Sequence, residues 1–253
     1  MTWPSRFDVV LGAFRWLEYA GLVGFIGVVV IRRLAAMPPP LGWARPSMKP
    51  ALVAALVGGI GVALAETWRD WRPTGAGAIR VLAEGVALLL CIYARRWVVP
   101  PALVAVAALA FAGHAMDVNP AAGAVVTDAV HVLSAGMWAG GIMVLATLLP
   151  PGGWRGEAGR ALLERFGRVA FLAFAITALT GVLRAIDSVH SVNALWETRY
   201  GLVLSVKVAG VLVMVAMSAV VWRRKPAAAR YEALIVLLVL AATAVLAVSQ
   251  VPH

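Results

Sequence analysis

The hydrophobic residues of this chain are gathered into long runs that are separated by polar residues and prolines. Eight runs approach the roughly 20 residues that a helix needs to cross about 30 Å of hydrocarbon. They lie near residues 9–31, 51–67, 78–94, 98–115, 125–149, 166–186, 200–222 and 231–249. The pattern predicts an all-α polytopic membrane protein, a bundle of about eight transmembrane helices that forms a single transmembrane domain over residues 1–253.

Composition supports the membrane class. Hydrophobic residues make up 62% of the chain and charged residues 13%, whereas soluble domains carry about 25% charged residues. The net charge of +10 would favour a nucleic-acid partner in a soluble protein, but here the basic residues lie in short loops. They are therefore interpreted as topology signals, and no nucleic-acid partner is expected. A single cysteine, Cys91, excludes an internal disulfide and a thiolate metal cluster.

Basic residues occur in alternate connections between the runs. Connections rich in lysine and arginine face the cytoplasm, and four connections here have that character. Their basic residues are Arg32, Arg33, Arg45 and Lys49; Arg95 and Arg96; Arg155, Arg160, Arg165 and Arg168; and Arg223, Arg224, Lys225 and Arg230. Both termini are then expected on the outer side. All aspartates and histidines fall at or near that same outer face.

The densest polar segment joins the fourth run to the fifth. It contains GHAMDVNP at residues 113–120 and TDAVHVLSAGMWAGG at residues 127–141. Because the connection is short, His114 and His131 are expected at similar depth, where they can share one ligand. Imidazole binds copper, zinc, iron and nickel, and a thioether such as Met116 selects for monovalent copper. The alternative is that both histidines cap helix ends or hydrogen-bond each other.

Two further residues extend this candidate metal site. Asp128 precedes His131 by one helical turn, so its carboxylate can bind the metal directly or orient the imidazole. His190, in the connection after the sixth run, is a candidate for a further ligand, with a solvated loop histidine as the alternative. The candidate metal ligands are thus His114, His131, Asp128, Met116 and His190.

Polar and thioether groups deeper in the runs form a possible pathway. Glu18, Glu84 and Lys207 are costly inside a membrane, so they should face protein or water. Pairing of Arg15 with Glu18, or of a glutamate with Lys207, is the structural alternative to a pathway. The methionines of the outer and inner halves are candidates for stepwise passage of copper, although methionine more often fills gaps. They are Met137, Met143, Met214 and Met217.

Three long segments carry a resemblance to a known family. HVLSAGMWAGG, then RFGRVAFLAFAITALTGVLRA, then ETRYGLVLSVKVAGVLVMVAMSAVVWRR resemble the copper resistance protein D (CopD) family of bacterial inner-membrane proteins. The likeness covers roughly residues 128–251, and the expected CopD-like part is 111–253. It includes Tyr200 with Gly201, Lys207 and Glu232. Residues 1–110 resemble the family in hydropathy alone.

The resemblance implies copper binding and transport, usually uptake across the bacterial inner (cytoplasmic) membrane, with a periplasmic CopC-type copper chaperone as donor. His114 and His131 stand where the family pattern has histidines. No nucleotide-binding loop motif of the GxxxxGK[ST] type occurs in the chain. None is required, because an inside-negative potential favours inward movement of a cation by about 2.3 kcal/mol per charge per 100 mV.

Two other functions remain open at this point. Histidines from adjacent helices are able to hold a haem, as in a membrane cytochrome. A copper-sensing or assembly factor would bind the metal without moving it. An enzyme is not expected, because no serine or cysteine has a histidine and a carboxylate in a context that indicates a catalytic triad.

Overall fold

The computed structural model describes residues 6–70, 75–94, 97–111, 121–188, 194–220 and 229–248. Every regular element within those residues is a helix, so the expected all-α fold is confirmed. The helices are α1 (Arg6–Ala36), α2 (Lys49–Asp70), α3 (Gly75–Leu89), η1 (Leu90–Ala94), α4 (Val99–Phe111), α5 (Ala121–Ala135), η3 (Gly136–Gly140), α6 (Gly141–Leu145), α7 (Glu157–Ser188), α8 (Ala194–Glu197), α9 (Arg199–Val220) and α10 (Ala229–Val248).

A helix occurs at each of the eight hydrophobic runs. The third run continues from α3 into the π-helical turn η1, and the fifth is built from α5, the π-helical turn η3 and α6. Six of these helical segments are long and apolar enough to cross a membrane, whereas α4 and α10 contain shorter apolar stretches. The described residues thus provide six candidate spans, and the number of eight crossings stays a prediction.

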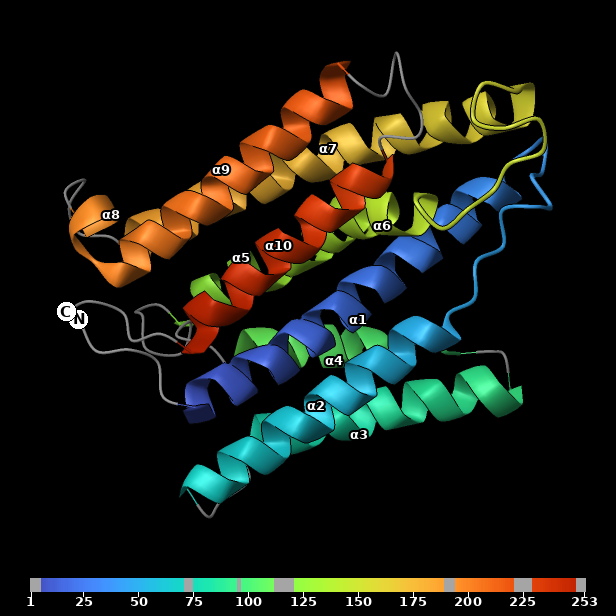
Figure 1. Ribbon diagram of the computed structural model, residues 1–253. Helices are drawn as coiled ribbons and strands as arrows, with labels where there is room; N and C mark the ends of the chain where they lie inside the picture. The colour runs from blue at the N-terminus through green and yellow to red at the C-terminus, as the bar shows by residue number, and fades with distance from the viewer. Residues whose placement is uncertain are drawn as a thin grey trace.

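The helices lie roughly side by side, with α1 in the middle (Figure 1). On one side α1 packs closely along α2, and α3 packs against both α2 and α4. On the other side α1 contacts η3, α6 and α10, while α7 packs on α5 and α9 packs on α10. The first turn of α1 and the last turn of α10 lie at the same end of the bundle, as expected if the chain crosses an even number of times.

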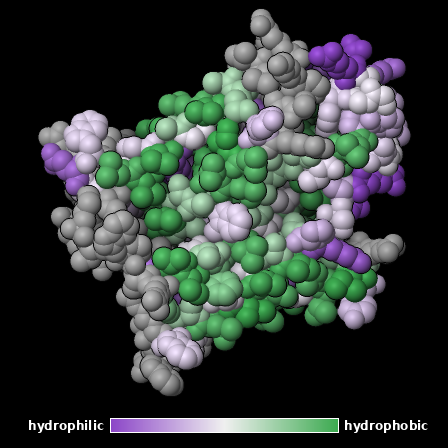
Figure 2. All heavy atoms as spheres, viewed as in Figure 1, coloured by the Kyte–Doolittle hydropathy of each residue, from purple (hydrophilic) through white to green (hydrophobic). Residues whose placement is uncertain are grey.

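Many large hydrophobic side chains are exposed on the outside of the bundle. They include Leu64, Leu82, Phe171, Leu172 and Leu238. Figure 2 shows hydrophobic residues across the middle of the visible face and hydrophilic residues gathered mainly at the end where α1 ends and α7 begins. The arginines of both connections at that end are among those predicted to face the cytoplasm. A lipid-facing belt with polar ends is the arrangement that a bilayer requires.

The two sides of the bundle meet where α1 crosses η3. A Cβ added at Gly27 would collide with the backbone of Gly140, and one added at Gly140 would collide with the carbonyl of Val23. The backbones of α1 and η3 are therefore in close contact, as small residues allow where membrane helices cross. Gly27 and Gly140 thus serve the packing of α1 on η3.

An arginine fastens the chain that leaves α1. Arg165 of α7 donates hydrogen bonds to the carbonyls of Leu34, Met37 and Pro39, at 2.9, 3.0 and 2.8 Å. These carbonyls lie at or just beyond the end of α1, where helical hydrogen bonding stops. The connection is thus tied to the start of α7.

Candidate functional site

His131 lies on α5 and faces α7. Nδ1 of its ring lies 3.0 Å from the hydroxyl oxygen of Thr180. Gly181 makes room for the ring, since a Cβ at that position would stand 3.3 Å from Cε1 of His131. The imidazole is therefore held against α7 by a hydrogen bond at one ring atom and by close packing at the next.

The protonation of this imidazole follows from the hydrogen bonds of Thr180. The threonine has one hydroxyl proton, which it donates to the carbonyl of Ile176 at 2.7 Å. Nδ1 of His131 must then carry a hydrogen and donate it to Thr180 Oγ1, a tautomer assigned from the network. Nε2 keeps its lone pair, which is the state of a histidine ready to bind a metal ion.

A second polar contact joins α5 and α7 one turn further along. The hydroxyl oxygens of Thr177 and Ser134 lie 2.8 Å apart, and Ser134 donates to the carbonyl of His131 at 3.1 Å. Both hydroxyl side chains are buried. A hydroxyl-lined seam therefore continues inward from the imidazole.

Three charged residues surround His131. Nε of Arg184 on α7 lies 2.6 Å from Oδ1 of Asp128, with the Asp128 side chain 11% exposed and that of Arg184 42% exposed. Lys207 of α9 lies within electrostatic range of both Asp128 and His131. The three charged residues thus come from α5, α7 and α9, and they are two cations and one carboxylate.

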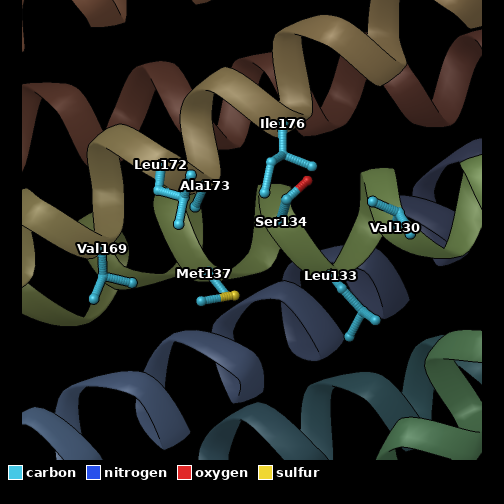
Figure 3. A pocket seen from close by; sticks show the side chains of 8 residues that line it. All are labelled: Val130, Leu133, Ser134, Met137, Val169, Leu172, Ala173 and Ile176. Atoms are coloured by element: carbon cyan, nitrogen blue, oxygen red, sulfur yellow. The ribbon is translucent and has the colours of Figure 1, made fainter.

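A pocket of about 290 Å³ lies between the two helices next to this seam. Figure 3 shows residues of α5 and η3 on one side and residues of α7 on the other. Ser134 and the thioether of Met137 are its polar and polarisable members, and the remaining lining is aliphatic. Val130 and Leu172, which also line it, are exposed, so the pocket reaches the surface of the bundle.

The sequence predicted five metal ligands, of which the structure describes two. Asp128 and His131 lie on the same face of α5 as predicted, and the carboxylate pairs with Arg184. His114, Met116 and His190 lie outside the described residues. Within the described residues, no group of three or more His, Cys, Asp or Glu side chains could hold a metal ion. Metal binding at these positions stays a prediction.

The four methionines lie on the C-terminal side of the bundle. Met214 is buried in the apolar cluster formed by α1, η3, α6, α7, α9 and α10, and Met137 and Met143 pack against that cluster. Met217 follows on α9 and is half-buried. Their positions fit gap filling, and a role in copper passage stays a prediction.

The ionisable groups of the first helices pair differently from what the sequence suggested. Arg15 binds Glu66 at 2.6 Å rather than Glu18. Glu18 instead forms an ion pair with Arg80, and both are buried. The carboxylate within range of Lys207 is that of Asp128, so a glutamate is not its partner among the described residues.

Sequence reasoning missed the residues that support His131. Thr177, Thr180 and Arg184 are spaced by three and four residues, which puts them on one face of α7. That periodicity was the available signal. It was obscured because a threonine in an apolar helix commonly bonds its own backbone.

Comparison with known proteins bears on this half of the bundle. Residues 160–249 match the family model described as Copper resistance protein D. This part of the chain is similar to the CopD family. The resemblance predicted from the sequence is thereby confirmed for a segment that contains Thr180, Arg184 and Lys207, whereas Asp128 and His131 precede it. The expected start of the CopD-like part at residue 111 stays a prediction.

A curated relative also concerns copper. The chain is 34% identical over 104 residues to the Copper transport protein CutJ of Bacillus subtilis (strain 168). The aligned part covers 40% of this chain and 19% of that protein, so the chain spans about a fifth of the relative's length. No solved structure matches. The family model and the relative thus both concern copper, one by its resistance and the other by its transport.

Proposed function

We propose that this protein binds copper at the end of the bundle where α5 begins and moves it across the bacterial inner membrane toward the cytoplasm. Copper is the cargo, and Nε2 of His131 is its central ligand. The observation that carries the proposal is the hydrogen bond between His131 Nδ1 and Thr180, which orients the ring and leaves Nε2 able to bind a metal.

Further ligands would come from residues near this end of the bundle. His114 and Met116 precede α5 in the chain, and His190 follows α7, and all three are proposed as ligands from their sequence positions. Asp128 is the nearby carboxylate. Imidazole with thioether favours monovalent copper, whereas imidazole with carboxylate suits the divalent ion.

The inward path would continue along the seam between α5 and α7. From His131 to Met137 the helix rises by about 9 Å, past the Ser134 hydroxyl and into the pocket. Beyond it Met143 lies on α6, and Met214 and Met217 lie on α9. Lys207 stands close to His131 and would set the local charge that copper meets.

The outer side is assigned from the loops. The basic connections after α1 and before α7 lie at one end of the bundle, so His131 lies nearer the opposite end, which would face the periplasm. A CopC-type chaperone would deliver copper there, and the membrane potential would drive the ion inward.

The test is copper accumulation by cells that express the protein. His131→Ala should abolish the accumulation that the wild type adds. Val132→Ala, a control that truncates the next residue of the same helix, should retain it. Equal accumulation with His131→Ala and wild type, at equal membrane levels of both, would contradict the proposal.

Two other outcomes would point to the alternatives. A haem absorption band in protein purified from haem-replete cells, lost in His131→Ala, would indicate a cytochrome. Stoichiometric copper binding without flux in reconstituted vesicles would indicate a sensing or assembly factor.

A further inference from the structure

A second buried polar cluster lies on the N-terminal side of the bundle, outside the CopD match and away from His131. Glu18 of α1 and Arg80 and Glu84 of α3 each have 0% of their surface exposed. Arg80 and Glu84 are four residues apart and share a face of α3. From Gly75 to Glu84 the helix rises by about 14 Å, so the cluster lies well inside the bundle.

The two carboxylates meet at a gap that glycine leaves in α2. A Cβ added at Gly59 would collide with Oε2 of Glu84 and would stand 3.3 Å from Oε1 of Glu18. A Cβ added at Gly58 would collide with the backbone of Glu18. The glycine pair thus allows α1 and α3 to bring both acids to the same point against the α2 backbone.

The cluster does not balance its charge among the described residues. Arg80 pairs with Glu18, while the carboxyl group of Glu84 lies against that of Glu18. The neighbouring charges, Arg15 and Glu66, balance each other in an ion pair. Tyr19 lies beside Arg15, and α4, which also packs on α3, contains no titratable residue. One carboxylate is therefore left over.

An ionised carboxylate in this position would be an unpaired charge inside a membrane bundle, which costs several kcal/mol. A proton removes that cost and also supplies a donor, because one carboxyl group can then hydrogen-bond to the other acid. A hard metal cation fits less well. It requires about six oxygen ligands, whereas Glu18 and Glu84 offer four, and the Arg80 guanidinium repels it.

A groove lies at the surface between α2 and α3, the two helices that enclose this cluster with α1. The groove has a volume of about 420 Å³, and Glu66 and Thr67 line it. Glu66 contacts Arg15, which precedes Glu18 by one turn of α1. Ionisable groups thus follow one another from the groove to the buried acids.

We propose that Glu18 and Glu84 hold one exchangeable proton between them, which enters from the α2–α3 groove past Glu66 and Arg15. The protein would then bind a second cation, a proton, at a site separate from that for copper. This site does not depend on His131, so the two proposals can fail independently.

Infrared spectroscopy of the purified full-length protein tests this directly. The wild type at neutral pH should show the carbonyl stretch of a protonated carboxyl group, shifted in deuterium oxide. The band should be lost in Glu84→Gln or Glu18→Gln when each is made together with Glu232→Gln, because Glu232 is another buried carboxyl group. It should persist in Glu232→Gln, which changes a buried carboxylate of α10 that accepts a hydrogen bond from Ser218. Copper binding should be unchanged in Glu84→Gln.

A second measurement requires no variant. A hydrophobic carbodiimide reacts with protonated carboxyl groups, and peptide mass spectrometry should locate its adduct on Glu84 or Glu18, with less adduct as pH rises. Adduct on neither residue, together with no protonated carbonyl band, would overturn the proposal. A band that survives both glutamine variants, or a tightly bound sodium ion in place of the proton, would overturn it as well.

Discussion

Thr180→Val tests how the imidazole of His131 is held. Valine keeps the shape of threonine but cannot accept the hydrogen bond from Nδ1, which lies 3.0 Å from the Thr180 hydroxyl oxygen. The packing of Gly181 against Cε1 remains, so the ring should stay near its place while its tautomer and angle are no longer fixed. We therefore expect weakened copper binding rather than complete loss.

The size of the effect follows from the role of such partners. Removing the group that orients a metal-binding histidine lowers metal affinity by about 10- to 100-fold, or about 1.4 to 2.7 kcal/mol. Loss of one hydrogen bond between membrane helices costs stability by only about 0.6 kcal/mol on average. Copper affinity should thus change clearly while the melting temperature changes little.

Chelator competition on purified protein would measure the affinity. Thr243→Val is the matched control, because Thr243 of α10 also donates to a carbonyl four residues earlier, at 2.8 Å, but lies on another helix. It should bind copper as the wild type does. If Thr180→Val also binds as the wild type while His131→Ala does not, the orienting role of Thr180 is refuted.

Four further predictions concern charge and packing. Lys207→Met should bind copper several-fold more tightly in chelator competition, because a cation near His131 is removed. Lys207→Arg keeps the charge and should not bind more tightly; weaker binding by Lys207→Met would contradict the charge argument. Arg184→Gln should lower the melting temperature by removing the ion pair between Arg184 and Asp128, and adding Asp128→Asn should recover most of the loss; no recovery would show that the pair is not the cause. Gly140→Ala should cost about 1–3 kcal/mol by overpacking, seen as a lower melting temperature, whereas Gly167→Ala meets nothing within 4 Å and should melt as the wild type does. Arg165→Ala removes three hydrogen bonds and should speed proteolysis between α1 and α2, whereas the exposed Arg168→Ala should leave the rate unchanged.

The positions of the helices could be predicted because a bilayer leaves few alternatives. A run such as 166–186 must pair its backbone internally, so its hydropathy alone predicts α7. Close contact between helices depends on small residues such as glycine, which permit two backbones to touch. Which glycines meet was not predictable, because Gly27 and Gly140 are far apart in the chain.

The pairing of charges could not be predicted for the same reason. Glu18 was expected to need a partner, but Arg15 is nearer in sequence than Arg80, and the sequence says nothing about which face of α3 turns toward α1. At His131 the sequence predicted Asp128 as a possible orienting group. The structure instead gives that position to Thr180, because α7 brings its hydroxyl to Nδ1 while Arg184 binds the carboxylate.

The two polar clusters are out of balance in opposite directions, and each imbalance favours a different chemistry. Around His131, the described charges are Arg184 and Lys207 against the carboxylate of Asp128, so an arriving copper ion would meet excess positive charge from these three residues. Tight binding there requires that a cation move away or that further ligands bring negative charge. The same excess positive charge would help the copper ion to leave again. Around Glu84 the excess is negative and enclosed, which favours the smallest cation available. Because α1 contacts both sides of the bundle through Glu18 and Gly27, a shift of this helix would alter both clusters at once.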